Sequence, residues 1–198
     1  MQRLQTIAEG ISRVGAVVGG AMLMIAAVVI CIDIALRYAL SWTVGGADEL
    51  SGYALAISSA WGFSAALLTR SHIRIDTVYV RVKARVRAML DLLSLACLAF
   101  FFALITWHAF GVLEQSYTSD SHSMSAIQMP LVVPQALWVL GLAFFVAVSL
   151  LLLARGLHAF VAGDFYRLFA SIGSKSAVAE AQEEVIAVER AIEQEKNR

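Results

Sequence analysis

The four histidines are the side chains of this chain best suited to hold a cofactor. They are His72, His108, His122 and His158. A haem in a membrane needs paired His ligands at one depth. His108 lies near one end of an apolar run, His158 lies at the opposite end of another, and the other two lie in connections. We therefore predict that no cofactor is bound and that His108 hydrogen-bonds within the helix packing.

Other chemistry has little support in the sequence. There is no glycine-rich phosphate loop, nucleotide fingerprint or nucleophile elbow. Cys31 and Cys97 lack metal-ligand spacing, and we expect them to be buried as small apolar side chains. The formal net charge of zero gives no support to a nucleic-acid partner. These observations predict no catalytic residue and no metal site, and hence a protein that is not an enzyme.

Asp33 and Arg37 are the charged pair that stands out inside an apolar region. Their i, i+4 spacing puts a carboxylate and a guanidinium one helical turn apart, where they can pair. One interpretation is an ion or substrate path, and the other is a self-neutralised pair near the membrane surface. We favour the second, because a nearby partner lowers the cost of burying the charge.

The elements that must carry these residues are membrane-spanning helices. The chain has 198 residues, of which 60% are hydrophobic and 15% are charged, whereas a soluble domain has about 25% charged residues. About 20 apolar residues in a helix cross the hydrocarbon core of a bilayer, and an isolated span satisfies its backbone as a helix. We predict an all-α integral membrane protein with spans at about 14–40, 50–69, 89–113 and 131–156.

The basic residues predict the orientation. Six of the 15 Lys and Arg lie in the connection between the second and third spans, and six more lie between Arg155 and the C-terminus. The connection 114–130 contains none. Because cytoplasmic loops carry the excess of Lys and Arg, both termini and the 70–88 loop are predicted to be cytoplasmic.

The flanking segments are predicted to lie outside the bilayer core. Residues 1–13 fit a short amphipathic helix on the inner membrane surface, although a plain helical extension of the first span fits them equally well. Residues 159–198 are read as an interfacial segment followed by a soluble cytoplasmic tail. The serine-rich connection between the third and fourth spans is expected to be solvated.

Small residues recur every four positions along the second span. They are Ala54, Ser58, Gly62 and Ala66. Such a stripe indicates close helix packing, against this chain or a partner. Asp48 and Glu49 precede it, where carboxylates complement the dipole of a helix N-terminus.

Several short motifs follow one another along the four predicted spans. They are Arg37-Tyr38, Asp48-Glu49, the stripe through Gly62 and Ala66, Arg70 with His72-Ile73-Arg74-Ile75-Asp76, Ile127-Gln128-Met129-Pro130, and Gly141. In this order they resemble the small membrane subunit, the DctQ-type protein, of tripartite ATP-independent periplasmic (TRAP) transporters. The resemblance covers roughly residues 14–158. The family more often has Glu-Glu where this chain has Asp48-Glu49.

The resemblance implies a small, non-transporting subunit in the bacterial inner membrane. Its partners would be a large, many-span, sodium-coupled membrane subunit, an extracytoplasmic substrate-binding protein that associates transiently, and membrane lipid. The transported substrate would be an organic acid. The residues implied at the partner interface or in ordering loops are Arg37, Asp48, Glu49, His72, Arg74 and Asp76. Two alternatives remain open, namely the membrane anchor of a redox complex and a small stand-alone transporter.

Overall fold

The computed structural model describes residues 2–43, 45–69, 83–163 and 168. These residues form four long helices, which confirms the all-α prediction. The helices are α1 (Gln2–Leu40), α2 (Ala47–Leu68), α4 (Ala84–Thr118) and α5 (Val132–Val161). The predicted loop residues His72, Arg74 and Asp76 lie outside the described residues, as does the tail from residue 169.

Helix length and composition separate α2 from the other three helices. In the described part of the chain, α1, α4 and α5 are long and apolar enough to cross a membrane. At about 1.5 Å per residue, the 39 residues of α1 reach about 58 Å and the 22 residues of α2 about 33 Å. Helix α2 is also rich in the small residues Ser, Gly and Ala.

The first helix is continuous across the predicted boundary at residue 13. Residues 2–40 form one helix with no break where an interfacial segment was predicted to end. The backbone therefore has the form of a helical extension of the first span. The position of residues 1–13 on the membrane surface stays a prediction.

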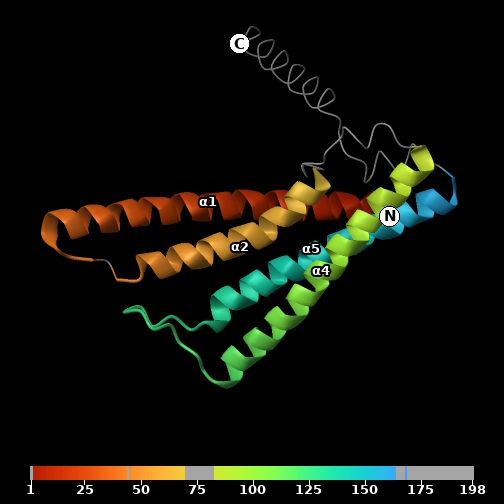
Figure 1. Ribbon diagram of the computed structural model, residues 1–198. Coiled ribbons are helices and arrows are strands. Elements are labelled where there is room, and N and C mark those ends of the chain that lie inside the picture. Colours follow the sequence, from red (N-terminus) through yellow and green to blue (C-terminus); the bar gives the residue numbers. More distant parts are fainter. Residues whose placement is uncertain (1, 44, 70–82, 164–167, 169–198) are drawn as a thin grey trace, which may run out of the picture.

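The four helices are arranged as two hairpins, α1/α2 and α4/α5 (Figure 1). Helix α2 packs against both α1 and α5, and α4 packs against α5. The starts of α1 and α4 and the ends of α2 and α5 lie at one end of the bundle, which we call the basic end. The connections 41–46 and 119–131 lie at the other, which we call the loop end; the hairpins diverge toward it in Figure 1.

The hydrophobic core lies at the basic end and in the middle of the bundle. One cluster joins all four helices and includes Ala8, Leu67, Ala88 and Phe145. The ring of Phe102 packs against Phe145 of this cluster in a tilted arrangement, with centroids 4.4 Å apart. The hairpins are therefore held together by packing where they converge.

Much of the apolar surface of the helices faces outward. Only 6% of the apolar segment of α1 is buried against the rest of the chain. Cys31 and Cys97 are both exposed, so the expectation that they are buried in the protein interior is wrong. An apolar residue in a membrane helix can equally face lipid, and hydropathy does not distinguish the two environments.

Candidate functional site

The connection between α4 and α5 folds back toward the start of α2 (Figure 1). It is a narrow hairpin-like loop with an antiparallel bridge between His122 and Pro130. The backbone N–H of Ser123 donates to the carbonyl oxygen of Met129 over 2.9 Å, and that of Leu131 donates to the carbonyl of Ser121 over 3.0 Å. This ordered backbone fixes where the serine hydroxyls of the loop point.

Glu49 in the first turn of α2 connects that helix to the loop. Its carboxylate accepts hydrogen bonds from the hydroxyls of Ser123 and Tyr53. The Ser123 hydroxyl, whose residue is 8% exposed, also lies 2.8 Å from the hydroxyl of Ser125. The expectation that the serine-rich connection is simply solvated is therefore wrong for Ser123.

The same hydroxyls control the ionisation of Glu49. Hydrogen bonds from Ser123 first, and then from Ser125 and Tyr53, hold the pKa of Glu49 below its ordinary value of 4.5. These donors favour the charged form of the carboxylate. The contact is therefore strongest when Glu49 is ionised.

We expect the thermal stability of the purified chain to depend on pH through Glu49. The lowered pKa means that this stabilisation is complete above about pH 4.5 and is lost as the pH falls through the pKa of the folded state. In Glu49→Gln, melting temperatures measured over a series of pH values should decline less steeply on the acid side. Asp48→Asn is the matched control, since Asp48 is exposed. Equal acid slopes in wild type and Glu49→Gln would contradict the prediction.

Two glycines allow α2 to approach the loop. Gly45 and Gly46 have φ angles of 68° and 93°, in the left-handed region that favours glycine. A Cβ atom on Gly46 would lie 2.7 Å from Cδ1 of Ile127, which is too close for any side chain. The turn before α2 is thus shaped to fit against residues 125–127.

Asp33 joins the end of α1 to the same turn. One carboxylate oxygen accepts a hydrogen bond from Nη2 of Arg37 over 2.7 Å, and the other accepts one from Oγ1 of Thr43 over 2.7 Å. The predicted pairing of Asp33 with Arg37 is confirmed. The side chain of Asp33 is 4% exposed and that of Arg37 is 60% exposed, so a buried carboxylate is neutralised by a cation at the surface.

Removing either partner of this pair should have unequal effects. Arg37→Leu leaves a buried carboxylate short of a hydrogen-bond donor and its cation, and should lower the free energy of unfolding by about 1–3 kcal/mol. Asp33→Asn keeps a hydrogen-bonding group beside Thr43 and leaves Arg37 free to reach water, so the loss should stay below about 1 kcal/mol. Chemical unfolding in mild detergent measures both. A larger loss for Asp33→Asn would contradict the assignment.

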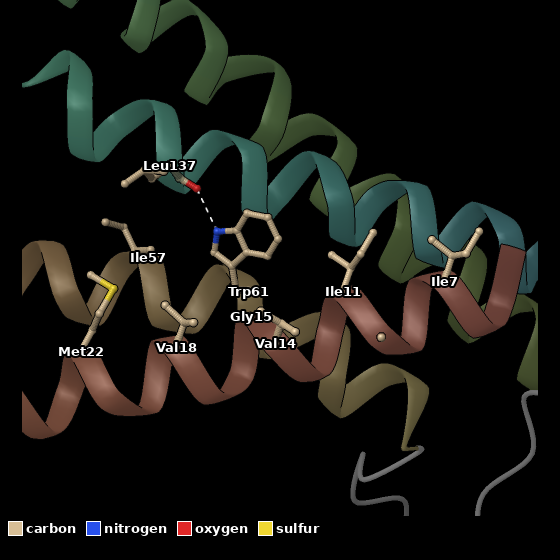
Figure 2. A pocket seen from close by; sticks show the side chains of 11 residues that line it. Ile7, Ile11, Val14, Gly15, Val18, Met22, Ile57, Trp61 and Leu137 are labelled. Carbon is tan, nitrogen blue, oxygen red and sulfur yellow. Dashed lines mark hydrogen bonds between the residues drawn. The ribbon is translucent and has the colours of Figure 1, made fainter.

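Trp61 is the side chain around which α1, α2 and α5 meet. Its indole N–H donates to the carbonyl oxygen of Leu137 over 3.1 Å. Its ring system stacks on Phe144, with centroids 5.7 Å apart. Figure 2 shows the indole projecting from α2 into the space between α1 and α5.

Glycines on two helices make room for this indole. A Cβ atom on Gly15 of α1 would lie 2.9 Å from Cε3 of Trp61, and one on Gly141 of α5 would lie 2.9 Å from Cδ1. Gly19 similarly accommodates Ser58, whose hydroxyl donates to the Gly19 carbonyl over 2.8 Å. These glycines therefore permit the three-helix contact.

The residues of the predicted small-residue stripe on α2 differ in how deeply they are buried. Ala54 and Ser58 are buried, whereas Gly62 and Ala66 are half-buried. A Cβ atom on Gly62 would meet nothing within 4 Å. The packing role of the whole stripe stays a prediction, and Trp61 is the contact on this helix that the sequence interpretation missed.

The described histidines point away from the helix packing. His108, His158 and His122 are exposed, and Nδ1 of His122 lies 2.8 Å from the carbonyl oxygen of Asp120 in the loop. The expectation that His108 hydrogen-bonds within the packing is wrong, because it lies on an outward face of α4. Among the described residues, no group of three or more His, Cys, Asp or Glu side chains is arranged to hold a metal ion.

The sequence matches a known protein family over most of its length. The model of the family described as "Tripartite ATP-independent periplasmic transporters, DctQ component" matches residues 26–159. No curated protein and no solved structure matches the chain. The matched region contains the Asp33 and Glu49 contacts, Trp61 and Gly141.

Proposed function

This chain belongs to the DctQ component family of tripartite ATP-independent periplasmic transporters, and from that premise we propose that it is the small, non-transporting membrane subunit of such a transporter. It supports a large, sodium-coupled, many-span membrane subunit, which carries an organic acid delivered by an extracytoplasmic binding protein. The family is one of transporter components rather than of enzymes.

The main support for a non-transporting role is that the buried carboxylates are already bound by other groups of the chain. Coupled transport commonly uses ionisable groups inside the membrane. In the described part of the chain, the two buried carboxylates are Asp33 and Asp91. Asp33 is bound to Arg37 and Thr43, and Asp91 also has an interaction partner. Carboxylates held in this way support a packed scaffold rather than an ion path.

All four helices cross the membrane in this proposal. Helix α2 packs on both α1 and α5 and is thus shielded by two more apolar helices. The Ser58 hydroxyl donates across the helix contact to the carbonyl of Gly19, and the Ser59 hydroxyl donates within α2 to the carbonyl of Leu55. Small and hydroxyl-bearing residues are typical of helices that pack against other helices in lipid.

The charges at the two ends of the bundle support the proposed orientation. The basic end carries Arg3, Arg13, Arg85, Arg87 and Arg155. The loop end carries Asp33, Asp48, Glu49, Glu114 and Asp120, with Arg37 beside Asp33. By the positive-inside rule, the basic end faces the cytoplasm of a bacterial cell, with both termini on that side.

Co-purification tests the subunit role. A tagged chain purified from its native host in mild detergent should bring down a large membrane protein. Recovery of this chain alone would contradict the proposal. A haem absorbance band would support the redox-anchor alternative, and solute movement by this chain reconstituted alone would support a stand-alone transporter.

The partner interface is proposed to include the loop motif His72, Arg74 and Asp76, with Arg37, Asp48 and Glu49 at the loop end. Asp76→Ala should lower both the yield of the complex and uptake. The matched control is Glu114→Ala, which removes an exposed carboxylate near the end of α4. Unchanged yield and uptake in Asp76→Ala would remove the loop motif from the interface.

A further inference from the structure

An open apolar groove runs between α1 and α5, with α2 behind it (Figure 2). Its volume is about 660 Å³, within the range of about 300–1,000 Å³ for small-molecule sites. Most of its wall comes from one face of α1, between Ile7 and Met22. The rest comes from Ile57, Trp61 and Leu137.

The side chains that line the groove are almost entirely apolar. Trp61 is the one lining side chain with a polar group, and its N–H already donates to the carbonyl of Leu137. The other lining side chains are aliphatic, methionine or glycine. An occupant therefore gains contact with apolar atoms and needs no hydrogen-bonding groups inside the groove.

Two of the glycines that line the groove already pack against α2. Trp61 packs on Gly15 and Ser58 packs on Gly19, so neither glycine leaves space for a further helix to approach. A Cβ atom on Gly10, in contrast, would meet nothing within 4 Å. The contacts of closely packed helices in lipid are enriched in small residues, whereas the free part of this wall is made mainly of branched side chains, with Gly10 among them. A flexible acyl chain fits such a surface better than a helix does.

Arg3 is exposed and precedes Ile7 by four residues, so it lies about one helical turn beyond the groove on the same face of α1. Glu9, the nearby acid, lies on another face and accepts a hydrogen bond from Gln5 over 2.8 Å. From Ile7 to Met22 the helix rises about 22 Å, more than half of the hydrocarbon thickness of about 30 Å. The wall of the groove is thus long enough to lie along most of an acyl chain of one leaflet, and the positive charge of Arg3 lies beyond its N-terminal end.

We propose that this groove binds one phospholipid, with an acyl chain along Ile11, Val14 and Trp61 and an anionic headgroup at Arg3. This site does not depend on the proposed transporter role. It rests on the apolar lining of the groove, on the indole N–H of Trp61 being already hydrogen-bonded, and on the positive charge of Arg3 one turn beyond the groove.

Native mass spectrometry of the full chain, with any co-purifying partner, tests this site. After addition of phosphatidylglycerol or phosphatidylcholine, wild type should retain one phospholipid, with phosphatidylglycerol preferred. Gly10→Trp should fill the groove and abolish retention. Gly20→Trp is the matched control, because Gly20 is on the same helix, also has open space, and does not line the groove. Equal retention by the two variants, with equal helicity, would overturn the site.

Arg3→Gln tests the headgroup contact separately. One basic residue near a lipid surface is worth about 1 kcal/mol, so the preference for phosphatidylglycerol should fall about fivefold. Arg13→Gln should keep the preference, and an unchanged ratio in Arg3→Gln would overturn the headgroup assignment. A photo-crosslinker placed at Gly10 in native membranes should label lipid. Labelling of a protein there would overturn the proposal in favour of a partner helix.

Discussion

Replacement of Trp61 by alanine is expected to lower the free energy of unfolding of the chain by about 3–5 kcal/mol. The substitution empties the space between Gly15 and Gly141 and leaves the carbonyl of Leu137 without its indole donor. Chemical unfolding in mild detergent, followed by circular dichroism, measures the change. Because α2 contacts both α1 and α5 through this residue, the loss should also weaken the association of the two hairpins.

Trp107→Ala provides the control for this experiment. Trp107 is 78% exposed on the outer face of α4, so its removal should change the free energy of unfolding far less. Similar losses in the two variants would show that tryptophan content, rather than the position of Trp61, determines stability. That result would contradict the central role assigned to Trp61.

A single methyl group at Gly141 is expected to destabilise the protein, although alanine favours helices. The added Cβ atom would lie 2.9 Å from both Cβ of Ala60 and Cδ1 of Trp61, so the helices must shift apart. Such overpacking costs about 1–3 kcal/mol. Thermal unfolding of Gly141→Ala should therefore show a lower transition temperature than wild type.

The matched variant Gly111→Ala should change stability in the opposite direction. A Cβ atom on Gly111 of α4 meets nothing within 4 Å, and alanine in a helix interior is favoured over glycine by about 0.5–1 kcal/mol. A second test is the pair Gly141→Ala with Trp61→Phe. If the clash is with the indole, the smaller ring should recover part of the loss, and purely additive effects would argue against direct contact.

The helices could be predicted from the sequence because a long apolar run is a local property. A described helix covers each of the four predicted apolar runs to within one residue, and the i, i+4 spacing of Asp33 and Arg37 was sufficient to predict their pairing. The helix ends were less predictable. Helix α1 continues back to Gln2 because the amphipathic residues before Arg13 keep the helical period.

The contacts between helices could not be predicted, because they depend on which faces meet. Nothing in the local sequence distinguishes Gly15 and Gly141, which face an indole, from Gly20 and Gly111, which face open space. Ser123 is buried only because α2 places Glu49 beside it. The outward position of His108 could not be predicted for the same reason, since hydropathy does not separate lipid-facing from packed positions.

The contacts of Glu49 with Ser123 and Tyr53 have a mechanical consequence. Apolar packing fixes the two hairpins where they converge, whereas polar contacts and the fit of Gly46 against Ile127 connect them at the loop end. The two hairpins are thus packed together at the basic end and joined by polar contacts at the loop end, where they diverge. Loss of the contacts at the loop end would change the angle between the hairpins while leaving each hairpin intact, and would so alter the surface that a partner contacts.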